Sequence, residues 1–286
     1  MSPQLLALLS AFAYSGCIIS ARRGLQYSTP ITVTYVSLLV HTATLWSAVF
    51  LTGGIPAVAT LALALFLIGG SLQPIIRLFT YSGIEKLGAS RSYTLRATTP
   101  LFSAIVAIAV LKEEAGWAIL LGTLLIVGGI MVVSWDRRDQ PASFRRWHLL
   151  IPVAAAFLAG IVHPIRRYAL SLSDEPLFFA AVVGAVSLFW FMGYLASPNA
   201  KQPVWHPKAI VPFVSAGLFE TLGILLNIMA LSHGSVVVVS PIIATSPLWV
   251  LIASVVFLRD LEKLNARTIL ASCCVVAGTI TIALGH

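Results

Sequence analysis

Ala97-Thr98-Thr99-Pro100-Leu101 opens a long apolar run that ends at Leu111-Lys112-Glu113, and the chain repeats this pattern once. Ala244-Thr245-Ser246-Pro247-Leu248 opens the second run, which ends at Leu258-Arg259-Asp260, at a constant offset of 147 residues. The same start, an apolar run of equal length and a basic-acidic end are not expected to recur together by chance. A repeat at one fixed offset therefore indicates a duplicated unit of about half the chain.

The composition is that of a membrane protein. Of 286 residues, 58% are hydrophobic and 10% are charged, whereas a soluble domain carries roughly 25% charged residues. The apolar runs are about 17 to 23 residues long, which is enough for a helix to cross a hydrocarbon core of about 30 Å. We predict an all-α polytopic membrane protein. Its net charge of +8 comes from basic residues at helix ends and does not suggest nucleic-acid binding.

The apolar runs predict ten transmembrane helices arranged as an inverted five-plus-five repeat. Their expected bounds are 4–20, 31–51, 63–83, 93–111 and 117–133 in the first half, and 149–165, 177–195, 209–231, 236–258 and 268–284 in the second. A polar connector over 136–147 predicts the boundary, so the two five-helix repeats cover residues 1–140 and 141–286. Because each repeat has an odd number of spans, the second must enter the membrane from the opposite face.

The basic residues of the predicted loops favour one orientation. Loops on one side of the membrane hold 13 Lys and Arg residues, and loops on the other side hold three, namely Lys112, Arg166 and Arg167. Lys and Arg are enriched in cytoplasmic loops. The count therefore predicts that both termini lie outside.

Charged side chains inside predicted spans are the first candidates for a transport function, because charge in lipid is costly unless it faces a cavity or a partner. Arg77 lies well inside the span 63–83, and Arg96 lies about one turn into the span 93–111. Two guanidinium groups near one face could bind a carboxylate or phosphate with paired hydrogen bonds. The alternative for Arg96 is that its long side chain reaches the lipid headgroups.

Glu220, near the middle of the span 209–231, is the only acidic residue inside a predicted span. Burial disfavours the charged form of a carboxyl group, so Glu220 could carry a proton. The alternative is a structural ion pair with Arg77 or Arg96. The two hypotheses are compatible, because a substrate anion that competes for the arginine would free Glu220 to take a proton.

Other polar residues within the spans are weaker candidates. Tyr14, Tyr81, His41, Asn227 and Ser246 could contact substrate, although most such residues in helix bundles form hydrogen bonds between helices. His163 could act as a proton relay, but a lone histidine in a membrane helix is more often a hydrogen-bonded interior residue.

Two prolines occupy matched positions in the repeat. Pro100 and Pro247 lie within the predicted spans 93–111 and 236–258, and proline in a membrane helix frees a carbonyl group and permits a bend. We therefore regard them as candidate hinges, with static curvature as the alternative.

The sequence carries no pattern typical of an enzyme or of a bound cofactor. It has no Gly-rich phosphate loop, no HExxH metal motif and no GxSxG nucleophile motif. The histidines also lack metal-like spacing. We therefore expect no enzymatic activity, no metal and no cofactor.

The repeated small-Pro-Leu start and the charged pair at the end of each run resemble the drug/metabolite transporter superfamily, specifically its EamA family. The stretch Leu87-Gly88-Ala89-Ser90 is similar to that family's usual entry to the fourth span. The family usually has Gly-Glu at the end of the run, whereas this chain has Lys112-Glu113 and Arg259-Asp260. The resemblance implies a gradient-driven carrier, often an exporter, in the inner cell membrane. It also implies cytoplasmic termini, which is opposite to the charge count.

Together these features predict a secondary active transporter that exports a small polar organic metabolite, anionic or zwitterionic, such as an amino acid. Its partners would be the lipid bilayer, the substrate and a proton or other gradient, and small faces in the spans 117–133 and 268–284 would allow a homodimer. Two alternatives stay open. One is a cationic drug/proton antiporter with Glu220 at its site, and the other is a membrane flippase for a phosphate-bearing lipid.

Overall fold

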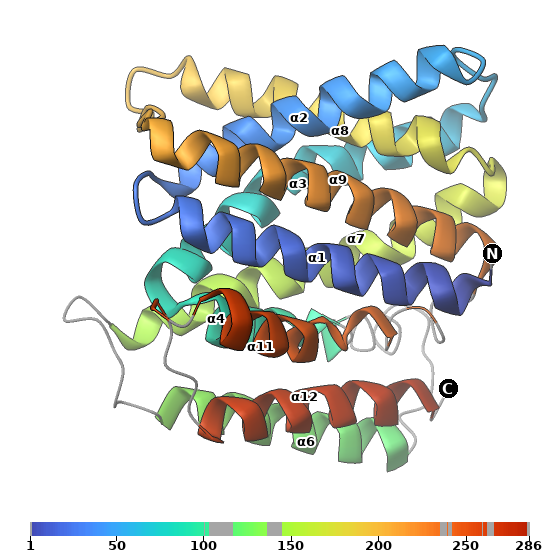
Figure 1. The fold of residues 1–286 in the computed structure, drawn as a ribbon. Coiled ribbons are helices and arrows are strands. Elements are labelled where there is room, and N and C mark those ends of the chain that lie inside the picture. Colours follow the sequence, from blue (N-terminus) through green and yellow to red (C-terminus); the bar gives the residue numbers. More distant parts are fainter. Residues whose placement is uncertain are drawn as a thin grey trace.

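The computed structural model describes residues 2–99, 101–102, 117–135, 145–234, 239, 242–258, 260–261 and 266–284. Within these ranges every regular element is a helix (Figure 1). The helices of the first half are α1 (Pro3–Gly24), α2 (Pro30–Leu51), α3 (Thr60–Leu87), α4 (Ala89–Arg96) and α6 (Trp117–Trp135). Those of the second half are η1 (Arg146–Leu149), α7 (Leu150–Leu172), α8 (Pro176–Leu195), α9 (Pro207–His233), α11 (Ser246–Phe257) and α12 (Ala266–Leu284).

Six helices in the described residues are long and apolar enough to cross a membrane, namely α1, α2, α3, α7 with η1, α8 and α9. The chain is therefore a multi-pass, all-helical membrane protein. The number of ten spans is not established. The predicted span 93–111 falls largely outside the described residues, and so does part of the span 236–258.

Capping side chains followed by proline set the start of the first two helices. The Ser2 side chain accepts a hydrogen bond from the backbone of Leu5, and the Thr29 side chain accepts one from the backbone of Thr32. Each of these caps is followed by a proline, which has no N–H group to leave unsatisfied in the first turn. The predicted starts of the first two spans are within one residue of the observed helices for this reason.

The predicted end of the span 149–165 is wrong, because α7 continues to Leu172. The predicted end of this span placed Arg166 and Arg167 in a loop. Both side chains instead find partners within the bundle. Arg166 donates to the side chain of Gln73 at 3.1 Å, and Arg167 donates to the carbonyl of Leu231 at 2.7 Å.

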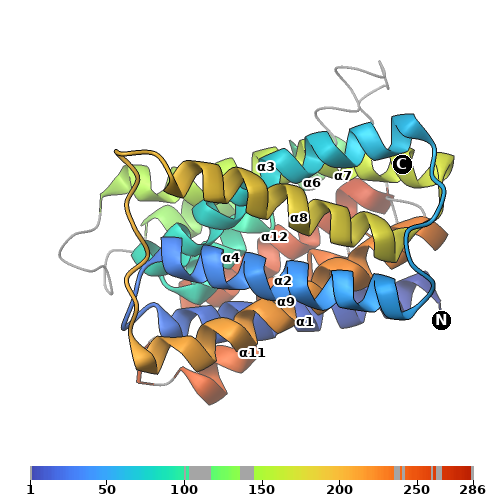
Figure 2. The ribbon, with the colours of Figure 1, turned by 90° about the horizontal axis from the view of Figure 1, so that it is seen from above.

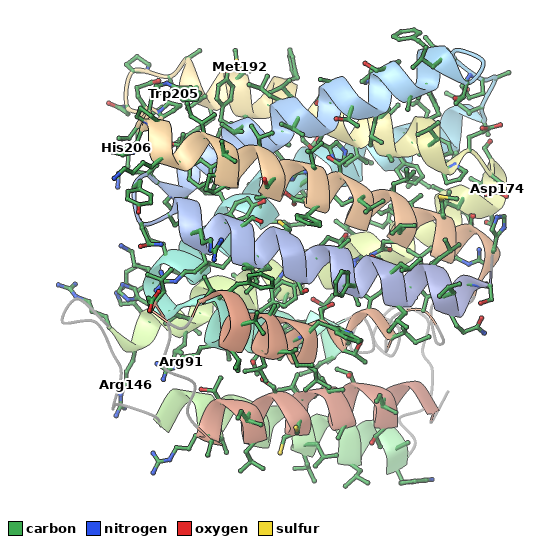
Figure 3. The ribbon with its side chains drawn as sticks, viewed as in Figure 1. Arg91, Arg146, Asp174, Met192, Trp205 and His206 are labelled. Carbon is green, nitrogen blue, oxygen red and sulfur yellow. The ribbon has the colours of Figure 1, made fainter. Side chains whose placement is uncertain are left out.

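The two halves pack crosswise. Helix α1 packs on α9 of the other half, α7 packs on α3, α2 packs on α8, and α6 packs on α12 (Figures 1 and 2). The first helices of the two halves run in opposite directions. Helix α1 starts at the end of the bundle marked N (Figure 1), whereas α7 runs from the end that holds Arg146 to the end that holds Asp174 (Figure 3).

Small residues allow this close packing. A Cβ atom at Gly223 of α9 would lie 3.1 Å from the ring of Tyr14 on α1, and one at Gly278 of α12 would lie 2.6 Å from the carbonyl of Gly122 on α6. Helix α3 contains Pro74, which has no N–H to offer to the carbonyl of Gly70. Ser187 of α8 donates to that carbonyl at 2.9 Å, so the bundle satisfies the group that proline leaves open.

Loops of the two halves also meet at both ends of the bundle. At one end, the hydroxyl of Ser28 donates to the carbonyl of Val204 at 2.5 Å. At the other end, the backbone N–H of Ala59 donates to the hydroxyl of Ser173 at 2.9 Å. Each end is therefore built from both halves of the chain.

Candidate functional site

A cavity of about 120 Å³ lies between the two halves. Helices α1, α3 and α4 line it from the first half, and α7, α9 and the segment 243–247 line it from the second. Its polar lining includes Tyr14, Arg77, Arg96, Arg166, Glu220 and Asn227. Because both halves contribute, any movement of one half against the other changes the shape of this cavity.

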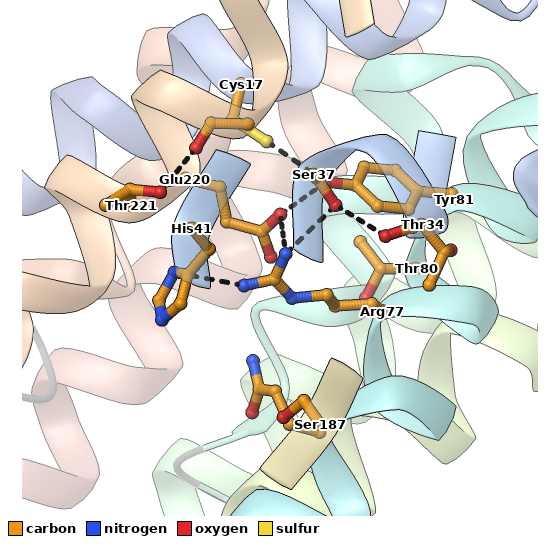
Figure 4. Close-up of polar contacts among 12 residues, drawn as sticks. Cys17, Thr34, Ser37, His41, Arg77, Thr80, Tyr81, Ser187, Glu220 and Thr221 are labelled. Carbon is orange, nitrogen blue, oxygen red and sulfur yellow. Dashed lines mark hydrogen bonds and ion pairs between the residues drawn. The ribbon is translucent and has the colours of Figure 1, made fainter. Parts of the chain in front are cut away.

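An ion pair joins the halves at one wall of the cavity (Figure 4). One terminal nitrogen of Arg77 on α3 lies 3.1 Å from Oε2 of Glu220 on α9, and the two side chains are 1% and 10% exposed. The hydroxyl of Tyr81 donates to the same oxygen at 2.5 Å. Thus α3 supplies one cation and one hydrogen-bond donor to a single carboxylate on α9, and of the two alternatives for Glu220 the pairing with Arg77 is present.

Helix α2 completes the surroundings of Arg77. The guanidinium donates to the hydroxyl of Ser37 at 2.9 Å and to Nδ1 of His41 at 3.3 Å. An Nδ1 that accepts from arginine leaves the ring proton on Nε2, and Nε2 lies 3.1 Å from the carbonyl of Ala180 on α8. His41 is fully buried and is not among the residues that line the cavity. It lies behind Arg77 and fixes its position.

Arg166 lies in the cavity wall, and sequence reasoning missed it because it assigned this residue to a loop. Arg166 is 4% exposed and its Nε has no hydrogen-bond partner. Among the described residues its one side-chain hydrogen bond is to Gln73. A helical signal was available in the sequence. Ala159, His163 and Arg166 recur at spacings of four and three residues, which places them on one helix face. That face lines the cavity.

Arg96 is the third guanidinium of the cavity lining. It lies at the end of α4 and donates to the hydroxyl of Thr99. In the described part of the chain neither Arg96 nor Arg166 forms an ion pair with a carboxylate. Tyr14 and His163 each lie within electrostatic range of both arginines. The two cations therefore face one shared region of the cavity.

Most of the remaining residues that the sequence predicted for the site line the cavity, and one of them lies outside the described residues. Tyr14, Tyr81, His163, Asn227, Ser246 and Pro247 all line the cavity. Pro247 is in the first turn of α11, whereas Pro100 lies outside the described residues. The side-chain oxygen of Asn227 is buried without a hydrogen-bond partner.

The charge of the cavity lining is unbalanced. Three guanidinium groups and one carboxylate give its described residues a formal charge of +2. Unpaired charge in a low-dielectric interior is unfavourable unless a partner arrives. The cavity is therefore suited to a negatively charged ligand. No group of three or more His, Cys, Asp or Glu side chains among the described residues could hold a metal ion.

Comparisons with known proteins agree with the fold. The model of a family described as the EamA-like transporter family matches residues 1–135 and 145–284. A solved structure, titled only as the crystal structure of a protein, aligns with 99% of this chain and 96% of its own. The TM-score is 0.68 at 12% sequence identity, so this likeness concerns the fold alone. No curated protein matches the chain.

Proposed function

This chain belongs to the EamA-like transporter family, and from that premise we propose that it is a secondary active transporter that exports a small organic anion by alternating access. The family places it among membrane transporters of the drug/metabolite type, which are not enzymes. The nature of the substrate, the direction and the coupling are our proposal. The sequence also allows a zwitterionic metabolite such as an amino acid, which carries an anionic group as well.

One observation carries the proposal: Arg96 and Arg166 face the cavity without a carboxylate partner among the described residues. Guanidinium groups bind carboxylate and phosphate groups with paired, charge-assisted hydrogen bonds. A cationic drug would instead meet a formal charge of +2. The cavity charge thus supports an anion carrier over the cation antiporter.

The size of the cavity supports a small substrate. A volume of about 120 Å³ corresponds to roughly ten water molecules at about 10–15 Å³ each. A ligand on the order of ten non-hydrogen atoms would fill it. A lipid with its headgroup is far larger, so the volume supports a metabolite over a flipped lipid.

The ion pair between Arg77 and Glu220 suggests how binding could be coupled to movement and to protons. It connects α3 of the first half with α9 of the second. A substrate anion that competes for Arg77 would weaken this connection and free Glu220 to take a proton. The halves could then move against each other, as in other carriers built from inverted repeats. Pro247, at the start of α11 in the cavity wall, is a candidate hinge in this movement.

The charge of the substrate favours export. A membrane potential that is negative inside contributes about 2.3 kcal/mol per elementary charge per 100 mV. An anion that leaves the cell moves with this potential as long as its negative charges outnumber the protons that Glu220 carries with it, whereas uptake would need coupled cations. The proposal of export therefore follows from the proposed sign of the substrate charge.

We further propose that the basic end of the bundle faces the cytoplasm of the inner cell membrane. Figure 3 labels Arg91 and Arg146 at this end and Asp174 at the other. Arg22, Arg23 and Lys208 belong to the same end, since they flank the loops joined by Ser28 and Val204. Arg166, one of three basic residues that opposed this orientation, lies inside α7. The termini would then lie outside.

The test is transport by purified protein in liposomes with labelled organic anions, cations and zwitterions. We expect uptake of anions, and we expect Arg166→Gln to raise the KM for them about tenfold or more, as expected for loss of a buried charge partner. Arg167→Gln is the matched control, because this neighbouring side chain bonds the end of α9 and does not line the cavity. Transport of cations without transport of anions would overturn the proposal.

A further inference from the structure

Two of the three cavity arginines lack an anionic partner in the described part of the chain. Arg77 has the carboxylate of Glu220. The guanidinium of Arg96 donates to a hydroxyl, and that of Arg166 donates to an amide oxygen and keeps its buried Nε unpartnered. Neutral acceptors do not cancel a positive charge. Among the described residues, the cavity therefore has two positive charges without a carboxylate partner, and an anionic ligand would balance them.

The two unbalanced arginines come from different halves of the chain. Arg96 ends α4 of the first half, and Arg166 belongs to α7 of the second. Both line the same cavity, and both act electrostatically on Tyr14 and on His163. One small ligand between them could be held from both halves at once.

The net charge of a bound ligand determines how much positive charge remains uncompensated in the cavity. The described lining has a formal charge of +2. A zwitterion leaves that charge unchanged, a monoanion leaves one positive charge, and a dianion leaves none. Uncompensated charge in a low-dielectric interior is strongly unfavourable. The preference should therefore rise with each negative charge on the ligand.

We infer that the ligand of this cavity is a dianion of about ten non-hydrogen atoms, a short dicarboxylate or a phosphate monoester, held by Arg96 and Arg166 together. This inference rests on the proposed function and specifies its substrate class. Tyr14 and Asn227 add hydroxyl and amide groups to the same wall. They suit the uncharged polar part of such a ligand.

The first experiment is a charge series at constant ligand length. Succinate, its monoamide and its diamide carry two, one and no negative charges, and their binding is measured by thermal stabilisation of the purified protein over a range of ligand concentrations. We expect succinate to bind at least about tenfold more tightly than the monoamide, and the diamide to give no stabilisation. The inference would be overturned if succinate and its monoamide bind equally and if, in the phosphate series below, methyl phosphate also binds equally at both pH values.

A second series tests a phosphate monoester, the other kind of dianion that the inference allows. Methyl phosphate changes from one to two negative charges as the pH rises through about 6, the second pKa of a phosphate monoester, whereas methyl sulfate keeps one charge. We expect methyl phosphate to bind more tightly at a pH of about 7.5 than at about 5.5, with no such gain for methyl sulfate. If the dianion binds more tightly than the monoanion only in the phosphate series, the ligand is assigned as a phosphate monoester. If this holds only in the succinate series, the ligand is assigned as a dicarboxylate.

Variants then test the two arginines. In Arg96→Gln and in Arg166→Gln the preference for the dianion over the matched monoanion should fall toward one, whereas Arg167→Gln should keep it. Arg96→Lys and Arg166→Lys retain the charge and serve where a glutamine variant does not fold. Retained preference in both glutamine variants would overturn the inference. If anions bind without charge preference, the inference fails and the proposed function stands. If no anion binds at all, both fail.

Discussion

Glu220 is held by two side chains of one helix, although it belongs to the other half of the chain. Arg77 forms an ion pair with its carboxylate at 3.1 Å, and Tyr81 donates a hydrogen bond to the same oxygen at 2.5 Å. This contact ties α3 to α9 beside the cavity. It therefore joins the part of the molecule that would bind substrate to the interface that would have to change in alternating access.

Removal of either partner of this ion pair should destabilise the protein. We expect Arg77→Met and Glu220→Leu each to lower the free energy of unfolding by about 3–5 kcal/mol, because each leaves a buried charge without its partner. The double variant should be more stable than the sum of the two single effects predicts. Unfolding in detergent micelles measures this cycle, and additive effects would show that the pair contributes no coupling.

A proton site at Glu220 gives a separate prediction. Glu220→Gln keeps the shape of the side chain but cannot gain or lose a proton. We expect the variant to bind substrate while the dependence of its transport rate on pH becomes weaker. Transport in liposomes from about pH 5.5 to 8, alongside ligand-induced thermal stabilisation, measures both. Complete loss of substrate binding would count against the coupling role.

Gly184 provides a test of how His41 holds Arg77. A Cβ atom at Gly184 of α8 would collide with the imidazole of His41, whereas one at Gly193 of the same helix would meet nothing within 4 Å. We expect Gly184→Ala to destabilise the protein by about 1–3 kcal/mol through overpacking. Gly193→Ala should be neutral or slightly stabilising, because alanine favours the helix. Thermal unfolding of the two variants measures this difference. Equal effects on stability would contradict the view that Gly184 leaves the space in which the imidazole of His41 lies.

The positive charge of the cavity can be measured with charged thiol reagents. Thr80 lines the cavity, and its hydroxyl donates to the carbonyl of Ile76 on its own helix. In a background without Cys17, Cys273 and Cys274, the ratio of the reaction rates with an anionic and a cationic methanethiosulfonate should be higher for Thr80→Cys than for a free thiol in solution. Arg166→Gln in the same background should reduce this ratio. A ratio at or below that of the free thiol would refute a positive cavity.

The proposed orientation predicts which loops are accessible from outside the cell. Ala57, in the loop between α2 and α3, and Asn199, in the loop between α8 and α9, are both exposed and belong to opposite ends of the bundle. Ala57→Cys in a cysteine-free background should be labelled in intact cells by a maleimide that does not cross membranes. Asn199→Cys should be labelled only after permeabilisation. The reverse pattern would place the termini in the cytoplasm.

The sequence by itself determined the class of the protein and much of its helix plan. Apolar runs of membrane length and capping residues such as Ser2 and Thr29 are local features, so the predicted span 31–51 nearly coincides with α2 (Pro30–Leu51). The repeat of Ala97–Leu101 at Ala244–Leu248 indicated the duplicated plan. The burial of Arg77 and Glu220 was also expected, because charged residues inside apolar runs are visible in the sequence.

Only the tertiary structure decided which charges are paired. That Glu220 pairs with Arg77 rather than Arg96, and that His41 lies behind Arg77 rather than in the cavity, depends on how helices from different halves cross. The spacing of Arg166 from His163 could have placed it on a helix, but its partner Gln73 lies on α3 of the first half, and only the structure shows that contact. The spacing of residues along a helix predicts which of its faces a side chain occupies. It does not predict which helix that face meets, and the meeting of helices from the two halves is what left Arg96 and Arg166 facing one cavity.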